Sequence, residues 1–85
     1  MIEVSKNKLN LIVDDINIGY ILFAEKEDYI VGNHIYINPD KRGLGFTAPL
    51  IKRFVEMSKE KNKKIEPICP VIKRILENKY REVIK

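Results

Sequence analysis

The hydrophobic pattern of this chain changes its period at Asn38-Pro39-Asp40, and the change divides the sequence into two structural halves. Before this point, short runs alternate in polarity or are rich in β-branched and aromatic residues, which predicts strands. From Thr47 onward, apolar residues recur at three- and four-residue spacing, which predicts a helix. Proline cannot donate to a strand ladder, and Asn and Asp favour turns, so a loop is expected at the switch point.

Four strands are expected in the first half: Ile2–Val4, Leu9–Val13, Ile18–Glu25 and Tyr29–Ile37. The connectors between them are polar and only a few residues long, so neighbouring strands should pair as antiparallel hairpins. Gly32 in the last strand indicates a bulge or a close backbone approach.

The second half contains a helix, a strand and a second helix. Thr47 is the expected N-cap of the first helix, and the cations at residues 61–63 suit its C-terminus. The strand Lys64–Ile68 follows, and Cys69-Pro70 opens a helix with an apolar stripe of Val71, Ile72, Ile75 and Leu76. Residues 80–85 form either a last helical turn or a short strand. The predicted fold class is α+β: an antiparallel β-β-β-β meander followed by α-β-α, with one crossover helix returning to a parallel strand.

Length and composition limit the kinds of protein this chain can be. Its 85 residues suffice for one domain, residues 1–85. The longest stretch without a charged residue, Tyr29 to Pro39, has 11 residues and is too short to cross a membrane. The N-terminus has no apolar segment of a secretion signal, so a cytoplasmic location is expected. A single cysteine and a single histidine exclude a disulfide framework and argue against a structural metal site.

Charge is distributed unevenly along the sequence. Residues 1–40 carry three basic and seven acidic side chains, whereas residues 41–85 carry thirteen basic and five acidic ones. A basic half favours an anionic partner such as a nucleic acid, a phosphorylated cofactor or a membrane surface. Solvated helix faces rich in lysine explain the same pattern equally well.

The segment Arg42-Gly43-Leu44-Gly45 joins a strand to a helix and has the properties of an anion site. Glycines let the backbone approach a ligand closely, and the N–H groups of a helix start point out at it. No acidic residue lies between Lys41 and Arg53 to neutralise the site. Phosphate suits such a site best. The segment lacks the Gly-Lys-Ser/Thr of a P-loop and the third glycine of a dinucleotide fingerprint.

Three motifs, taken together, resemble the GNAT superfamily of N-acetyltransferases. The run from Arg42 to Thr47 is similar to their acyl-CoA pyrophosphate loop, Gln/Arg-x-x-Gly-x-Gly/Ala, although Thr47 departs from the last small residue. The chain further resembles minimal members without the N-terminal substrate-binding helices. Their His-Thr-x-Val strand matches His34–Ile37, with Ile35 in place of Thr, and their Cys-x-x-Val/Ile element matches Cys69–Ile72.

The resemblance implies a truncated GNAT-like fold in which a splayed parallel strand pair receives acetyl-CoA or CoA. It places the pantetheine arm along Ile35, Tyr36 and Ile37. It places the pyrophosphate on the loop, whose predicted cofactor-binding residues are Arg42, Gly43, Leu44, Gly45, Phe46, Thr47 and Ala48. Lys73 in the second helix is a further predicted cofactor-binding residue. The acceptor of the acetyl group is then an unidentified amine. The protein is expected to be a monomer or a weak dimer.

Cys69 and His34 are the two predicted catalytic residues. Cys69 precedes a helix start, which favours a thiolate, and in the resembling family this cysteine faces the thioester. It either accepts the acetyl group or protonates the leaving thiolate, and the alternative is a small buried apolar side chain. His34 is expected on the same strand face as Gly32 and Tyr36, as a base or an orienting group, or simply as a hydrogen-bonded strand histidine.

Three functions follow from these features. The first is a small N-acetyltransferase that uses acetyl-CoA. The second is a CoA-binding module with little or no turnover, because so short a chain leaves few residues for an acceptor site. The third is a basic nucleic-acid-binding domain built on the C-terminal half, which the acidic surroundings of Tyr20 and Tyr29 disfavour.

Overall fold

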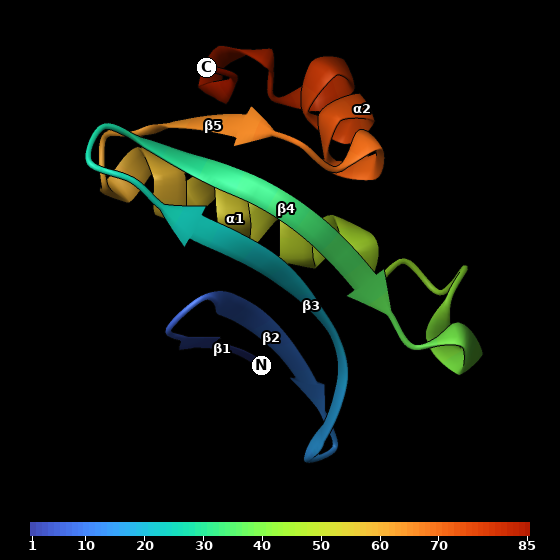
Figure 1. Cartoon of the computed structure of the whole chain (residues 1–85). Coiled ribbons are helices and arrows are strands. Elements are labelled where there is room, and N and C mark those ends of the chain that lie inside the picture. Colours follow the sequence, from blue (N-terminus) through green and yellow to red (C-terminus); the bar gives the residue numbers. More distant parts are fainter.

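The computed structural model covers residues 1–85 and contains one five-stranded sheet in the order β1-β2-β3-β4-β5 (Figure 1). The strands are β1 (Ile2–Ser5), β2 (Lys8–Val13), β3 (Ile16–Glu25), β4 (Tyr29–Ile37) and β5 (Lys64–Pro67). The first four pair antiparallel with their chain neighbours, which confirms the predicted meander. The β2–β3 turn is formed by Asp14 and Asp15, both at positive φ, as tight two-residue hairpins require.

β5 runs parallel to β4 and pairs with only the first part of it. The register runs from Tyr29 opposite Lys64 to Gly32 opposite Pro67. The Gly32 carbonyl then accepts the backbone N–H groups of both Ile68 and Cys69, where β5 ends. Residues 33–37 of β4 continue without a strand on that side. The predicted splayed parallel pair is therefore present.

A bulge in β4 corrects the predicted position of His34. Gly32 lies opposite Phe23 and His34 lies opposite Leu22, so Asn33 is an extra residue between them. Directly opposed residues share a face of the sheet, so Gly32 and His34 point to opposite faces. The expectation that they share a face is wrong, because the extra residue shifts the alternation by one. The expected irregularity near Gly32 is confirmed.

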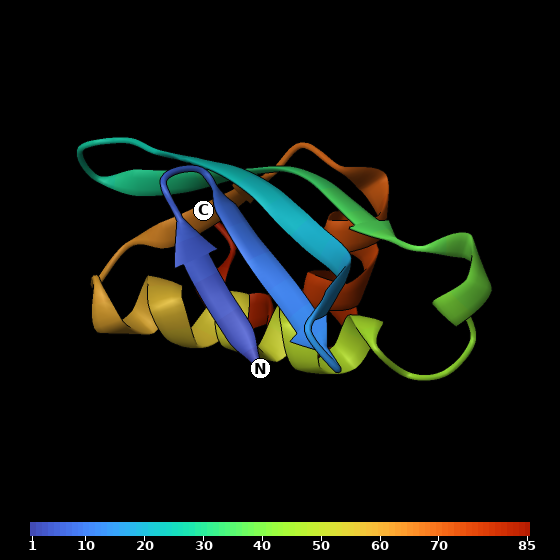
Figure 2. The same ribbon diagram turned by 90° about the horizontal axis from the view of Figure 1, so that it is seen from below.

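Two helices cover one face of the sheet, here called the inner face. Figure 2 shows α1 (Thr47–Glu60) beneath the sheet and α2 (Pro70–Lys79) on the same side. A Cβ placed on Gly32 would lie 3.2 Å from Phe54 of α1 and 3.5 Å from Ile72 of α2, so both helices pack against this point of β4. Phe54 also packs on Phe23, with ring centroids 6.0 Å apart. The opposite, outer face of β2–β4 carries no helix.

The apolar core lies between the inner face and the helices. Leu9, Ile21, Ile30, Phe54 and Ile65 are completely buried in it. Fully burying a side chain of this size contributes roughly 1.5–3 kcal/mol. Of the two short 3-10 helices, Pro39–Lys41 buries no residue, whereas Arg81–Val83 contributes Val83 to the core. After the second one, Ile84 forms an isolated parallel bridge with Ile65, so residues 80–85 combine a helical turn with a strand-like contact.

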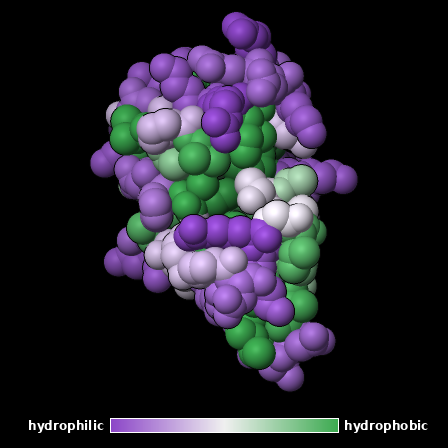
Figure 3. Space-filling view, turned by 90° about the vertical axis from the view of Figure 1, so that its right-hand side faces the viewer, coloured by the Kyte–Doolittle hydropathy of each residue, from purple (hydrophilic) through white to green (hydrophobic).

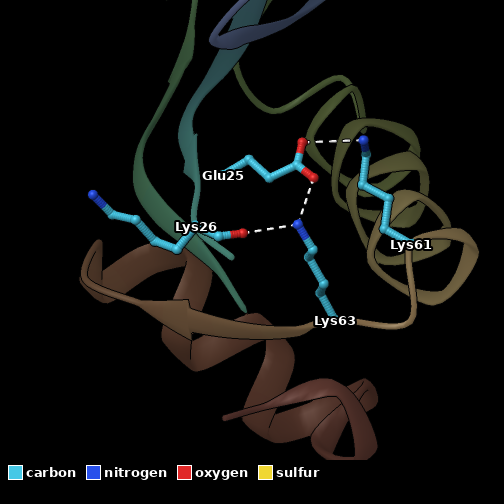
Figure 4. Close-up of polar contacts among 4 residues, drawn as sticks. All are labelled: Glu25, Lys26, Lys61 and Lys63. Atoms are coloured by element: carbon cyan, nitrogen blue, oxygen red, sulfur yellow. Dashed lines mark hydrogen bonds and ion pairs between the residues drawn. The ribbon is translucent and has the colours of Figure 1, made fainter. Parts of the chain in front are cut away.

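A polar cluster ties the β3–β4 hairpin to the turn between α1 and β5 (Figure 4). Glu25 accepts Lys63 Nζ at 2.7 Å and Lys61 Nζ at 3.0 Å, and Lys63 also donates to the Lys26 carbonyl. The hydrogen bond from Lys63, followed by that from Lys61, lowers the pKa of the Glu25 carboxyl. This cluster fixes the end of the molecule remote from the Arg42 loop.

Candidate functional site

The loop after β4 presents a row of unpaired backbone donors. None of the N–H groups from Gly43 to Ala48 donates a hydrogen bond within the protein. Pro49 has no N–H, and no acidic side chain lies in the first turn of α1. The partial positive charge of the helix start is therefore uncompensated and open to an anion.

Thr47 does not cap α1, contrary to the prediction. The N-cap position is taken by Phe46, which is already in the helical region at φ −74° and ψ −19°, and no side chain bonds to the helix start. Thr47 is instead the first helical residue. Because the N-cap residue Phe46 has no side-chain acceptor, the first-turn N–H groups remain available.

Both glycines of the loop have positive φ, +79° at Gly43 and +85° at Gly45. L-residues with a side chain rarely adopt this conformation, so glycine is required to turn the chain here. A Cβ at either position would have no atom within 4 Å. The glycines are thus needed for backbone conformation and leave open space in front of the loop.

A cavity of about 330 Å³ lies between the end of β4, the loop and α2. Figure 3 views this end of the molecule and shows apolar surface between two hydrophilic regions. The walls of the cavity combine apolar side chains with basic and small residues: Ile35, Ile37, Lys41, Arg42, Gly43, Phe46, Thr47 and Val71. The cavity lining thus combines apolar side chains with two cations, Lys41 and Arg42.

A second cavity of about 280 Å³ lies on the other side of the helix start. It is lined by Gly45, Thr47, Ala48, Ile75, Asn78 and Lys79. Val71, Ile75 and Lys79 all come from α2, so this helix supplies a wall to both cavities. Val71 belongs to the predicted apolar stripe of this helix, but it is 39% exposed and lines the first cavity. Lys73 is exposed and lines neither cavity.

The unpartnered part of β4 offers further backbone groups. The Asn38 N–H donates to the Ile18 carbonyl. Gly19 and Ile37, which lie opposite each other, therefore form a non-hydrogen-bonded pair of the antiparallel ladder. The Ile37 carbonyl accordingly points away from β3 and accepts Arg42 Nε at 2.9 Å. Since orientation alternates along a strand, the N–H and C=O of Ile35 point to the same free edge. Ile35 and Ile37 thus line the cavity with both side chains and backbone.

Cys69 lies where β5 separates from β4. It is the residue before α2, is 6% exposed and belongs to the apolar core on the inner face. Its N–H donates to the Gly32 carbonyl at 3.1 Å, and its carbonyl accepts the N–H of Lys73. These two hydrogen bonds fix the backbone of Cys69 at the point where β5 separates from β4.

His34 lies two residues beyond Gly32 on the outer face and is exposed, and its imidazole makes no hydrogen bond within the protein. Cys69 and His34 therefore lie at the same point along β4 but on opposite faces of the sheet. Tyr36 follows His34 on the outer face, where its ring stacks on Tyr20 with centroids 5.3 Å apart.

Comparison with known proteins identifies the family. The family model described as GCN5-related N-acetyl-transferase matches residues 8–83. The solution structure of a candidate GCN5-like N-acetyltransferase from Staphylococcus aureus is similar over 100% of this chain and 87% of its own, with a TM-score of 0.80 and 27% identity. The crystal structure of ribosomal-protein-alanine N-acetyltransferase from Brucella melitensis biovar Abortus 2308 shares the fold, with a TM-score of 0.65 and 22% identity over 92% of this chain and 62% of that one.

No curated protein matches the chain. No helix of the structure is both long and apolar enough to cross a membrane. The family match spans both the strand–loop–helix site and the splayed β4–β5 pair. The chain belongs to the GCN5-related N-acetyltransferase family.

Proposed function

We propose that this chain binds acetyl-CoA and transfers its acetyl group to an amine. The row of unpaired N–H groups from Gly43 to Ala48, at a helix start without a capping side chain or acidic residue, is the observation that carries the proposal. Such a row holds the two phosphates of a pyrophosphate without any lysine in direct contact.

The cavity beside the loop suits the pantetheine arm. This arm is a chain of methylenes interrupted by two amides, so it needs apolar walls and a few backbone partners. Ile35, Phe46 and Val71 provide apolar walls. The free edge of β4 at Ile35 provides one N–H and one C=O in the geometry of a strand partner. The arm would thus replace β5 beside β4 where β5 has separated.

With the arm along β4, we expect the thioester near Cys69 and Gly32, where β5 leaves β4. Acetyl-CoA supplies an activated acetyl group, whose carbonyl carbon is attacked by the neutral amine while the C–S bond breaks. The amine loses a proton, and the sulfur leaves as thiolate or takes up a proton. A backbone N–H near the thioester oxygen would stabilise the negative charge that develops on it. Cys69 is proposed as proton donor or acetyl acceptor, and His34 as a base for an amine arriving on the outer face.

Two basic residues at the loop support this proposal. Four basic residues of the C-terminal half pair with carboxylates: Arg53, Lys59, Lys61 and Lys63. Lys41 and Arg42 are among those that form no ion pair, and both line the cavity beside the start of α1. Their charge is therefore available to an anion bound at the helix start.

A thermal-shift experiment with acetyl-CoA, CoA and ATP tests binding. Acetyl-CoA and CoA at 100 times their dissociation constants should add about 2.7 kcal/mol to the free energy of unfolding. ATP, which has phosphates but no pantetheine, should stabilise the protein much less. Absence of any shift at millimolar CoA would refute the proposal. Release of free CoA thiol with a panel of amines then separates an enzyme from a module that only binds.

A further inference from the structure

The outer face of the sheet carries a row of alternating cations and aromatic rings that ends at the loop. Tyr20 and Tyr36 lie opposite each other on β3 and β4, with their rings stacked at 5.3 Å and an interplanar angle of 28°. Lys8 Nζ lies 4.6 Å from the centre of the Tyr20 ring, and the guanidinium carbon of Arg42 lies 5.8 Å from that of Tyr36. The row thus runs Lys8, Tyr20, Tyr36, Arg42.

We infer that Tyr36 is a positioning residue that holds the Arg42 guanidinium at the phosphate end of the acyl-CoA site. The inference rests on the proposed function, because it assigns Arg42 a phosphate ligand. It goes beyond that function by giving the side chain of Tyr36 a role on the outer face of the sheet, opposite the apolar core.

Arg42 is held at two points. Its Nε donates to the Ile37 carbonyl at 2.9 Å, and its guanidinium lies over the Tyr36 ring. Ile37 and Tyr36 are adjacent in β4. The bond to the Ile37 carbonyl holds the guanidinium at the strand edge, and the Tyr36 ring holds it against the outer face. A long, exposed side chain is thereby confined before any ligand arrives, which lowers the entropic cost of binding.

The terminal nitrogens of Arg42 remain free. Neither forms an ion pair or a hydrogen bond, although the side chain already uses Nε. A guanidinium presents its donors as a planar fork that matches two phosphate oxygens. Arg42 also lines the cavity beside Gly43, where the row of unpaired backbone N–H groups begins. The free side of the fork is therefore available to the same anion.

Tyr36 is itself held firmly. Its ring is half-buried against Tyr20, and Tyr20 in turn lies under Lys8 from β2. The Tyr36 hydroxyl makes no hydrogen bond, so only the ring contributes to the row. The contact with Arg42 depends on an aromatic face and not on the phenol, which makes Phe a conservative replacement and Leu a disruptive one.

A double-mutant cycle on CoA affinity, measured by titration calorimetry, tests the inference. Tyr36→Leu should weaken CoA binding about three- to fivefold, because the Arg42 side chain is then less confined in the free protein and must be ordered when CoA binds. Tyr36→Phe should leave the affinity unchanged. In an Arg42→Gln background, Tyr36→Leu should have no further effect, because the group through which it acts is gone. Pantetheine, which has no phosphate, should bind wild type and Tyr36→Leu equally.

The outcomes separate the inference from the proposed function. A wild-type chain that does not bind CoA overturns the proposed function and the inference with it. A wild-type chain that binds CoA, together with equal effects of Tyr36→Leu in both backgrounds, shows a general structural role for Tyr36 and overturns the inference alone. The same holds if Tyr36→Leu has no effect or weakens pantetheine binding equally. Melting temperatures of all variants show that the measured chains are folded.

Discussion

Replacing Gly45 by Asp and by Asn in parallel separates the charge at the loop from its conformation. The two side chains have nearly the same size and shape, and both must adopt the φ of +85° that Gly45 has. A left-handed conformation costs a side-chain-bearing residue roughly 1–2 kcal/mol, and Asn and Asp tolerate it better than most. Neither Cβ meets an atom within 4 Å, so no steric clash is added. The variants therefore differ only in one negative charge.

That charge should have opposite effects on stability and on binding. Without ligand, a carboxylate beside the uncapped start of α1 is favourable by about 0.3–1 kcal/mol, so Gly45→Asp should be more stable than Gly45→Asn. With ligand, a carboxylate and a phosphate about 6 Å apart would repel each other. At an effective dielectric constant near 20, and allowing for salt, the repulsion costs about 2 kcal/mol, or roughly 30-fold in affinity.

Thermal unfolding with and without CoA measures both effects in one series. At 100 times the wild-type dissociation constant, CoA should add about 2.7 kcal/mol to wild type but only about 0.9 kcal/mol to Gly45→Asp. Gly45→Asn should keep most of the wild-type gain. Without CoA, the Asp variant should melt about 2–5 °C above the Asn variant. If Asp and Asn respond to CoA equally, the reasoning is wrong, and the Gly43–Ala48 loop does not hold the phosphates.

Three further predictions concern the splay, the core and the polar cluster. Cys69→Ser should keep CoA binding but abolish any acetyl transfer, and iodoacetamide should alkylate Cys69 more slowly when CoA is present; labelling only on unfolding, unchanged by CoA, would remove this thiol from the site. Gly32→Ala should lower the free energy of unfolding by about 1–3 kcal/mol in a urea titration, because its Cβ would approach Phe54 to 3.2 Å; an unchanged midpoint would contradict the packing. Because Lys63 and Lys61 lower the pKa of Glu25, the stability that this carboxyl contributes should be present in full above pH 4.5 and be lost as the pH falls through its lowered pKa. Glu25→Gln should reduce the fall of the melting temperature as the pH is lowered below 4.5. An unchanged dependence of the melting temperature on pH would show that the ion pairs do not act in solution.

Much of the fold follows from local sequence pattern. The strand Tyr29–Ile37 was predicted with its observed bounds, since β-branched and aromatic residues run through it and Asn38-Pro39 must end it. The position of α1 follows likewise from the spacing of Leu50, Ile51, Phe54 and Val55, all of which are buried. Predictions of this kind succeed because each depends on residues within a few positions of one another.

The candidate site was predictable only in part. Gly43 and Gly45 at the start of a helix indicate an anion site, and the structure adds the unpaired N–H groups expected there. The role of α2 as a wall of both cavities gave no local signal, since Val71 fits a core stripe as well as it fits a cavity lining. Thr47 fits the N-cap preference, yet the chain enters the helix one residue earlier, through Phe46.

What the sequence determined by itself is the order of strands and helices, the flexible glycine turn and the absence of acidic residues at the helix start. Periodicity, φ preference and charge are properties of neighbouring residues, so they can be read along the chain. The tertiary structure alone decided which face each residue occupies. The extra residue Asn33 arises from pairing between β3 and β4, and it turns His34 away from Gly32 and Cys69. The row Lys8–Tyr20–Tyr36–Arg42 likewise exists only because three strands and a loop, distant in sequence, are brought side by side by the sheet register.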